Sequence, residues 1–165
     1  MLYSKILETP VGKMLAIADE EFLLLFDYVN SKHFETNRKI FGNNIFNFSN
    51  NIIDLLENEL FLYFKQKLTQ FSVPLKFNGT EFQRRVWQSL QQIPYGQTVS
   101  YLQQSEFLNV PRSVRAVAAA CGRNKISIVA PCHRVIGSDG SMRGYAGGLE
   151  QKKLLLQLEK TIENS

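Results

Sequence analysis

The chain has 165 residues, of which 44% are hydrophobic and 21% are charged, with a formal net charge of +4 and an isoelectric point near 9.1. This composition excludes a disordered chain and predicts a globular protein of one domain or two small ones. No apolar run approaches the roughly 20 residues that a membrane span needs. Charged residues interrupt positions 1–20, so no secretory signal is expected and a cytoplasmic location is predicted.

The positive charge is concentrated in the second half. Residues 1–79 contain 8 basic and 9 acidic side chains, whereas residues 80–165 contain 11 and 6. This asymmetry is consistent with a polyanionic partner for the second half, and on charge alone it is equally consistent with a basic surface that contacts only solvent. Two cysteines and two histidines are too few for a usual structural zinc site, so no metal is expected. Cys121 and Cys132 could form a disulfide, but free thiols in a reducing cytosol are the expectation.

The first 75 residues read as a scaffold. Residues 1–7, 13–18 and 22–29 predict three strands of a small antiparallel sheet, separated by turns at 9–12 and 19–21. Residues 30–50 are polar and predict a variable loop with a short strand. Apolar residues at helical spacing predict a helix over 51–68, followed by an extended connector at 71–75. No residue in this part indicates chemistry, and residues 76–79 form a linker to the rest.

Two capping boxes open the second half. Thr80 with Gln83 predicts a helix that ends near Pro94 and buries Val86, Leu90 and Trp87 on or beside one face. Arg84 and Arg85 on this helix are expected to face solvent or phosphate. Ser100 with Gln103 predicts a short helix to about residue 107.

A second short helix predicts a helix-turn-helix. After a turn at 108–110, Pro111 suits the first helical position, and residues 112–121 read as a helix closed by Gly122. Arg112 and Arg115 lie three apart on one side, and the alanines keep the helix slim enough to approach a nucleic-acid groove. The same residues fit equally well a tightly packed Ala-rich helix whose two arginines have no role in binding.

The segment around Cys132 is the candidate reactive site. The apolar run 128–130 leads into Pro131, which stiffens the backbone before Cys132-His133-Arg134. A base or a cation beside a thiol lowers its pKa and makes it nucleophilic, and His133 and Arg134 supply both kinds of neighbour. On these residues alone, a buried structural cysteine remains the alternative.

The chain ends in a glycine-rich loop and a helix. Four glycines within 138–148 predict tight turns with exposed amides, and a phosphate loop is a weak alternative. Residues 149–159 predict a helix that buries four leucines and leaves Lys152 and Lys153 near a polar edge. Glu159 lies beside Leu158 and could point at the core, but a surface position is the default expectation from the pattern. The inward-facing leucines are Leu149, Leu154, Leu155 and Leu158.

Seven motifs occur in a characteristic order. They are Phe82-Gln83 with Val86-Trp87, Ile93-Pro94-Tyr95-Gly96, Ser100-Tyr101, Arg115-Ala116-Val117, Asn124, Pro131-Cys132-His133-Arg134-Val135-Ile136 and Gly144-Tyr145-Ala146-Gly147-Gly148. With them the chain resembles the O6-alkylguanine-DNA alkyltransferases. The resemblance is strongest over 80–159 and looser over the first 75 residues.

The resemblance implies a fold and a domain division. The fold is mixed α/β (α+β), with a ribonuclease-H-like sheet and helix in an N-terminal scaffold domain, residues 1–75. A linker at 76–79 leads to a mostly helical, winged-helix-like DNA-binding and alkyl-acceptor domain at 80–165.

The resemblance also implies roles for residues. Cys132 is the alkyl acceptor, His133 accepts its proton through a water, and Glu159 orients and charge-stabilises His133. Asn124 braces the turn before the site, and Tyr101 donates to the leaving base. Further positions implied by the resemblance are Lys152 near the site, Val135, Tyr145 and Ala146 around the extruded base, and Arg115, Arg112, Ser113, Ala116 and Ser138 on DNA.

The implied function is DNA repair. One alkyl group passes irreversibly from O6-alkylguanine, and from O4-alkylthymine, in double-stranded DNA to Cys132, with Arg115 filling the gap left by the flipped base. No cofactor is needed. A helix-turn-helix usually enters the major groove, but the resemblance implies the minor groove, with little sequence specificity. A monomer is expected, and cooperative binding along DNA is possible.

Two other functions use the same features. A non-catalytic protein that binds alkylguanine damage needs the DNA-binding face and the pocket, but no activated thiol. A DNA-binding regulator that uses the helix-turn-helix alone predicts sequence-specific binding and no role for Cys132. Modification of Cys132 separates the repair function from both.

Overall fold

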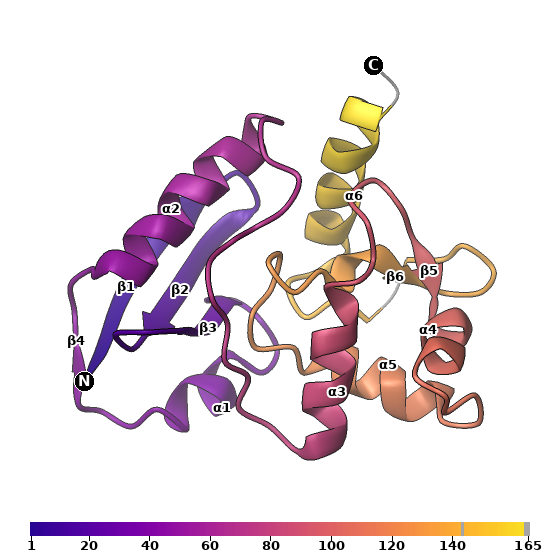
Figure 1. Ribbon diagram of the computed structural model, residues 1–165, viewed down its shortest axis with the longest axis horizontal. Coiled ribbons are helices and arrows are strands. Elements are labelled where there is room, and N and C mark those ends of the chain that lie inside the picture. The colour runs from indigo at the N-terminus through magenta and orange to yellow at the C-terminus, as the bar shows by residue number, and fades with distance from the viewer. Residues whose placement is uncertain (143, 164–165) are drawn as a thin grey trace.

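The computed structural model describes residues 1–142 and 144–163, with side chains through residue 160 (Figure 1). Its N-terminal half is a four-stranded sheet in the order β3-β2-β1-β4. The strands β1 (Leu2–Thr9), β2 (Gly12–Ala18) and β3 (Leu23–Tyr28) are antiparallel, as predicted, and β4 (Ile45–Phe46) runs parallel to β1. Every residue of β3 is buried, which makes this strand the centre of the molecule rather than an exposed edge.

Two helices accompany the sheet. Helix α2 (Asn51–Phe64) lies across one face of the sheet, and the Asn50 side chain caps it by accepting from the Ile53 amide (Figure 1). It ends four residues before the predicted limit because Gln66 adopts a left-handed φ of 61° that breaks the helix. Helix α1 (Phe34–Lys39) was not predicted, since its polar sequence has no apolar periodicity.

The C-terminal half is mostly helical. Helices α3 (Glu81–Leu90) and α4 (Tyr101–Phe107) both begin with the predicted capping boxes. Trp87 is fully buried, and its indole N–H donates to the Ala120 carbonyl of α5, so the prediction of a core residue is confirmed. Arg84 and Arg85 are both exposed to solvent, as predicted, and Arg85 also donates to the Leu108 carbonyl at the C-cap of α4.

The helix-turn-helix is formed by α4 and α5 (Val114–Gly122), with Asn109 at a left-handed φ of 61° in the turn. Helix α5 begins two residues later than predicted. Pro111 and Arg112 lie in the preceding turn, and Gly122 is the last helical residue rather than the cap. Val117 and Ala120 face the core, while Arg115 is exposed.

The final elements are a single 3-10 turn, η1 (Cys132–Arg134), the short strand β6 (Val135–Ile136) and helix α6 (Leu149–Glu163). The predicted inward face of α6 was partly wrong. Leu149 is 53% exposed and Leu154 is 39% exposed, whereas Lys152, Leu155 and Glu159 are buried. These three residues follow the spacing i, i+3, i+7 and form the true inner stripe, which is polar at two of its three positions.

The two halves share one hydrophobic core that runs from Leu7 to Leu155. The chain segment just before the cysteine docks on β3: the Phe26 amide donates to the Lys125 carbonyl, and the Ser127 amide donates to the Phe26 carbonyl. The linker follows the other end of β3, where Leu23 exchanges hydrogen bonds with Pro74 and Lys76. Strand β3 therefore holds both the linker and the cysteine segment. Among the described helices, none has the length and apolar character for crossing a membrane.

Candidate active site

Backbone pairing brings the candidate site together. Strands β5 (Val99–Ser100) and β6 pair in parallel, with Val99 opposite Val135 and Ser100 opposite Ile136. This register places Tyr101, the first residue of α4, beside the segment that follows Cys132. Residues 31 positions or more apart in sequence thus meet through a two-residue strand pair, which periodicity cannot reveal.

Cys132 lies in the 3-10 turn and is 5% exposed. Pro131, at φ −82° and ψ 65°, precedes this turn as its N-cap. Ile128, in the apolar run before Pro131, has a φ of 70°, which is a strained conformation for a β-branched residue. The apolar run is buried as predicted, and its bend directs the chain into the site.

Asn124 connects this bend to the sulfur. Its Nδ2 donates to the Ala130 carbonyl at 2.8 Å and to Cys132 Sγ at 3.2 Å, and its Oδ1 accepts from the Ile126 amide at 3.1 Å. The side chain is 2% exposed. These hydrogen bonds join Asn124 to the backbone at residues 126 and 130 and give the sulfur a hydrogen-bond donor.

The resting thiol is neutral. Burial raises the pKa of Cys132 to about 11, and the Asn124 hydrogen bond and the Lys152 charge offset only part of that rise. Lys152 is itself fully buried, donates to the Val135 carbonyl at 2.7 Å and lies 5.8 Å from the centre of the Tyr101 ring. Its pKa is lowered by burial. The low thiol pKa expected from the sequence is therefore absent in the resting protein, and proton removal needs a base.

His133 is in the right state to be that base. It is fully buried, and burial together with nearby Arg134 and Lys152 lowers its pKa although Glu159 opposes the shift. Its Nε2 lies 2.8 Å from Glu159 Oε2. A neutral imidazole that donates from Nε2 keeps its lone pair on Nδ1. Nδ1 is buried and has no hydrogen-bond partner among the described residues.

Glu159 is 1% exposed, so the surface position expected from the helical pattern was wrong. Arg134 donates to it from Nε at 2.8 Å and from Nη2 at 3.0 Å, and its Nη1 donates to the Ile93 carbonyl. Burial raises the pKa of Glu159, but His133 and Arg134 outweigh burial and hold this pKa well below its usual range. Arg134 thus acts on the carboxylate and not on the thiol, which corrects the expectation from its place beside Cys132.

The predicted base pocket is built around Tyr145, which is 7% exposed. Its hydroxyl and that of Tyr28 on β3 are 2.7 Å apart, and their rings meet edge to face. A Cβ on Gly147 would lie 2.3 Å from the Tyr28 ring, so this close approach requires glycine. Val135 is fully buried and Ala146 is half-buried beside Tyr145.

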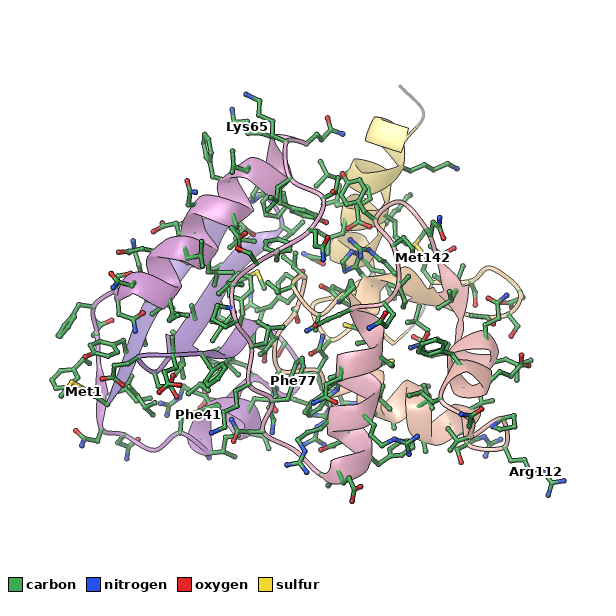
Figure 2. The ribbon with its side chains drawn as sticks, in the orientation of Figure 1. Met1, Phe41, Lys65, Phe77, Arg112 and Met142 are labelled. Atoms are coloured by element: carbon green, nitrogen blue, oxygen red, sulfur yellow. The ribbon has the colours of Figure 1, made fainter. Side chains whose placement is uncertain are left out.

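The predicted DNA-binding residues lie on α5, in the turn before it and, for Ser138, in the loop after β6. Arg112, Arg115, Ala116 and Ser138 are exposed, and Ser113 is half-buried. Figure 2 shows Arg112 projecting from the turn before α5 away from the body of the molecule. No acidic side chain interrupts residues 110–125.

A cavity of about 410 Å³ lies between this helix and the glycine-rich loop. The residues that line it come from three parts of the chain, and His33 and Lys32 are the contribution of the N-terminal half. The others are Ala118, Ala119, Gly122, Arg123, Gly144, Tyr145 and Ala146.

Sequence reasoning missed two tyrosines of the N-terminal half. Tyr28 contacts Tyr145, and Tyr63 on α2 donates to Glu159 Oε2 at 2.6 Å. The statement that residues 1–75 carry no chemistry therefore needs correction, because both hydroxyls reach predicted site residues. Each tyrosine sits in an apolar pattern typical of core positions, so the sequence held no signal for its hydroxyl contact.

The remaining chemistry of the site is limited. Both cysteines are free thiols, so the conceivable disulfide is not formed. Within the described part of the chain, no three His, Cys, Asp or Glu side chains gather as metal ligands. The arrangement offers a buried thiol, a neutral imidazole and an ionised carboxylate, which suits proton removal and nucleophilic attack.

Comparison with known proteins identifies the family. The family described as 6-O-methylguanine DNA methyltransferase, DNA binding domain, matches residues 81–161. A methylated-DNA–protein-cysteine methyltransferase of Methanosarcina barkeri is 38% identical over 96% of this chain and 98% of its own length. One from Mycolicibacterium paratuberculosis is 52% identical, over 62% of each chain.

Solved structures of the same family resemble this chain over nearly its whole length. The crystal structure of Mycobacterium tuberculosis OGT in complex with DNA is 33% identical, with a TM-score of 0.86 over 96% of this chain and 93% of that one. The structure of the Mycobacterium tuberculosis O6-methylguanine methyltransferase is 35% identical, with a TM-score of 0.85 over 98% and 94%. The predicted mixed α/β fold is confirmed. The chain belongs to the family of methylated-DNA–protein-cysteine methyltransferases, which are DNA-repair methyltransferases with a DNA-binding domain.

Proposed function

We propose that this chain removes methyl and larger alkyl groups from O6 of guanine in double-stranded DNA by moving them irreversibly to its own Cys132. The observation that carries the proposal is a buried neutral thiol, held by Asn124, beside a neutral His133 that is bound to Glu159. A thiol kept only for packing needs no ionised carboxylate and no base around it.

The proposed reaction balances in three proton transfers. The Cys132 S–H proton passes through one water to His133 Nδ1, and Glu159 stabilises the imidazolium that forms. The thiolate attacks the alkyl carbon, the carbon–O6 bond breaks, and its electron pair stays on the guanine. Tyr101 donates a proton to the leaving base, and the proton taken up by His133 then returns to the Tyr101 oxygen, so that both side chains regain their starting state. The net change converts thiol and O6-alkylguanine into thioether and guanine, so one molecule reacts once.

The duplex hides O6, so the base has to leave the stack. In the proposal, exposed Arg115 fills the gap, and Arg112, Ser113, Ala116 and Ser138 contact the DNA. The alanines on the outside of α5 suit a narrow minor groove, where little sequence is read. Binding should therefore tolerate sequence and weaken with salt. The pocket at Val135, Tyr145 and Ala146 is proposed to receive O4-alkylthymine as well.

The proposed acceptor is tested by mass spectrometry after incubation with a duplex that contains O6-methylguanine. The Cys132 peptide should gain about 14 Da, the mass of one methylene, with a stoichiometry of one per chain. Cys132→Ser is the control, because it should bind the same duplex without any mass change.

Tight binding by the unmodified chain without a mass shift would contradict transfer and support a damage-binding protein. A mass shift on Cys121 would place the acceptor elsewhere. Cys121 is fully buried on α5, and burial raises its pKa strongly, which argues against it as a nucleophile.

A further inference from the structure

The carboxylate of Glu159 receives a hydrogen bond from outside its own half of the molecule. Tyr63 on α2 donates from its hydroxyl to Oε2 at 2.6 Å, and this is the oxygen that His133 Nε2 contacts at 2.8 Å. Arg134 binds both oxygens. The Glu159 carboxylate therefore joins α2, η1 and α6, and the Tyr63 hydroxyl links the N-terminal half to the proposed base through this carboxylate.

The packing holds this hydroxyl in place. Tyr63 is 1% exposed, and its ring lies against Phe64, Phe71 and Tyr95 at centroid distances of 5.1, 5.3 and 6.2 Å. Burial, and then the Glu159 charge, raise the pKa of Tyr63 well above its ordinary value, so the hydroxyl stays a donor. A phenylalanine would fill the same apolar space, and packing alone gives no reason for the oxygen.

We propose that Tyr63 is a positioning residue that tunes the base through Glu159, so that the N-terminal half sets the pH range in which the thiol is activated. The inference rests on the proposed function for its effect on the reaction, but its effect on His133 is independent of DNA. By donating to Oε2, Tyr63 withdraws negative charge from the oxygen that faces the imidazole. It thereby limits how strongly Glu159 favours imidazolium, and keeps His133 neutral and able to accept a proton.

The direction of the effect follows from the charges around His133. Glu159 is the neighbouring group that favours its protonation, while burial, Arg134 and Lys152 oppose it. Removing the Tyr63 hydroxyl strengthens the Glu159 contribution, so the pKa of His133 should rise. Among the described residues, the charged or titratable side chains that face this unit are Tyr63 from α2, Tyr95 from the turn after α3, Arg134 and Cys132 from η1, Lys152 and Glu159 from α6, and Tyr145 from the glycine-rich loop.

Tyr63→Phe tests the proposal through two readouts. His133 is titrated by NMR in the DNA-free protein, where the chain has only two histidines and His33→Gln identifies the other signal. The pKa of His133 should rise by about half a unit. In the pH profile of the single-turnover rate with O6-methylguanine duplex, the fall in rate on the acid side should then occur at a pH that is higher by the same amount. The result is roughly threefold slower transfer on the acid side and a smaller change on the alkaline side.

Gln66→Asn is the matched control. Gln66 Nε2 donates to the Leu158 carbonyl at 3.0 Å, so it also ties α2 to α6, but it does not touch Glu159. Asparagine tolerates the left-handed φ of 61°, and its shorter side chain withdraws the donor. If Tyr63 acted only as a tether between the halves, both variants would change the rate at all pH values and leave the pKa of His133 in place. That outcome overturns the proposal.

A second change tests the sign without loss of the ring. Incorporating 3,5-difluorotyrosine at position 63 strengthens the donor, so the pKa of His133 should move down rather than up. Identical titration curves in the wild type, Tyr63→Phe and the fluorinated protein would refute the role of the hydroxyl. If the wild type transfers no alkyl group, but the pKa of His133 shifts as described in Tyr63→Phe and in the fluorinated protein, the proposed function fails while the positioning role stands.

Discussion

At the scale of single residues, the site depends on buried polar atoms whose partners are few and fixed. Asn124 satisfies an amide, a carbonyl and the sulfur of Cys132 with one side chain. Glu159 collects donors from Tyr63, His133 and Arg134. Loss of one partner leaves a buried group unpaired, which costs more than the bond itself contributes.

Asn124→Ala should therefore act on both stability and chemistry. It leaves the Ile126 amide and the Ala130 carbonyl without this partner in a buried bend, at a cost of about 2–4 kcal/mol in the free energy of unfolding. It also removes a donor to Cys132 Sγ, so the thiol pKa should rise further and transfer from a free O6-benzylguanine base should slow. Urea unfolding and the pH dependence of that reaction measure the two effects. A lower free energy of unfolding with unchanged transfer would contradict the link to the sulfur.

At the scale of elements, helix α5 presents its functional residues to solvent, whereas helix α6 presents them to the interior. Helix α5 buries Val117 and Ala120 and leaves Arg115 and Ala116 exposed. Helix α6 does the reverse with its polar residues, because Lys152 and Glu159 face inward. The first helix is thus available to DNA, and the second supplies charges to the thiol and its proposed base.

Arg115→Ala should separate base extrusion from the chemistry. Transfer from O6-methylguanine in duplex DNA should fall by about tenfold or more, whereas reaction with a free O6-benzylguanine base should change little, because only the duplex requires the gap in the stack to be filled. Single-turnover rates with the two substrates measure this ratio. Arg84→Ala, an exposed arginine on α3, is the control and should leave the ratio unchanged. Equal losses with both substrates would contradict the extrusion role.

At the scale of the whole molecule, β3 links the two halves. It pairs with β2, receives residues 125–127 at Phe26, and places the linker at Leu23. Its Asp27 is fully buried, accepts from Ser31 at 2.9 Å and Asn37 at 3.2 Å, and keeps Oδ1 without a partner among the described residues. Burial raises the pKa of Asp27 from 3.8 to about 6 although both hydrogen bonds oppose the shift.

The raised pKa of Asp27 gives a test of stability against pH. Because the folded value exceeds the unfolded one, the neutral carboxyl favours folding below about pH 4, and this contribution is lost as the pH rises through about 6. Asp27→Asn should therefore raise the free energy of unfolding by about 1–3 kcal/mol near pH 8 relative to the wild type, and by much less near pH 4. Urea unfolding at both pH values measures the difference. A constant difference would mean that Asp27 does not titrate in this range.

Part of this protein was determined by its sequence alone. Helical and strand periodicity, two capping boxes and the Asn109 turn follow from local sterics and hydrogen bonding, and they located the strands of the sheet and helices α3 and α4. The reactive candidate Cys132 and the order of the motifs could also be read from the chain. These features depend on neighbours within a few residues, which is the range that a sequence pattern reports.

The tertiary structure decided the rest. Hydrophobic patterning placed Glu159 and Lys152 at the surface, but both are buried because hydrogen-bond partners replace the water that a surface would supply. These partners are His133 and Arg134 of η1 for Glu159, and the Val135 carbonyl of β6 for Lys152. Arg134, which is adjacent to Cys132 in sequence, binds the Glu159 carboxylate instead of the thiol. The raised pKa that keeps the Cys132 thiol neutral results from burial, which no motif encodes. Tyr28 and Tyr63 joined the site only because β3 and α2 bring their hydroxyls across the shared core. Contacts between residues about a hundred positions apart depend on how the elements pack, and that information is spread over the whole chain.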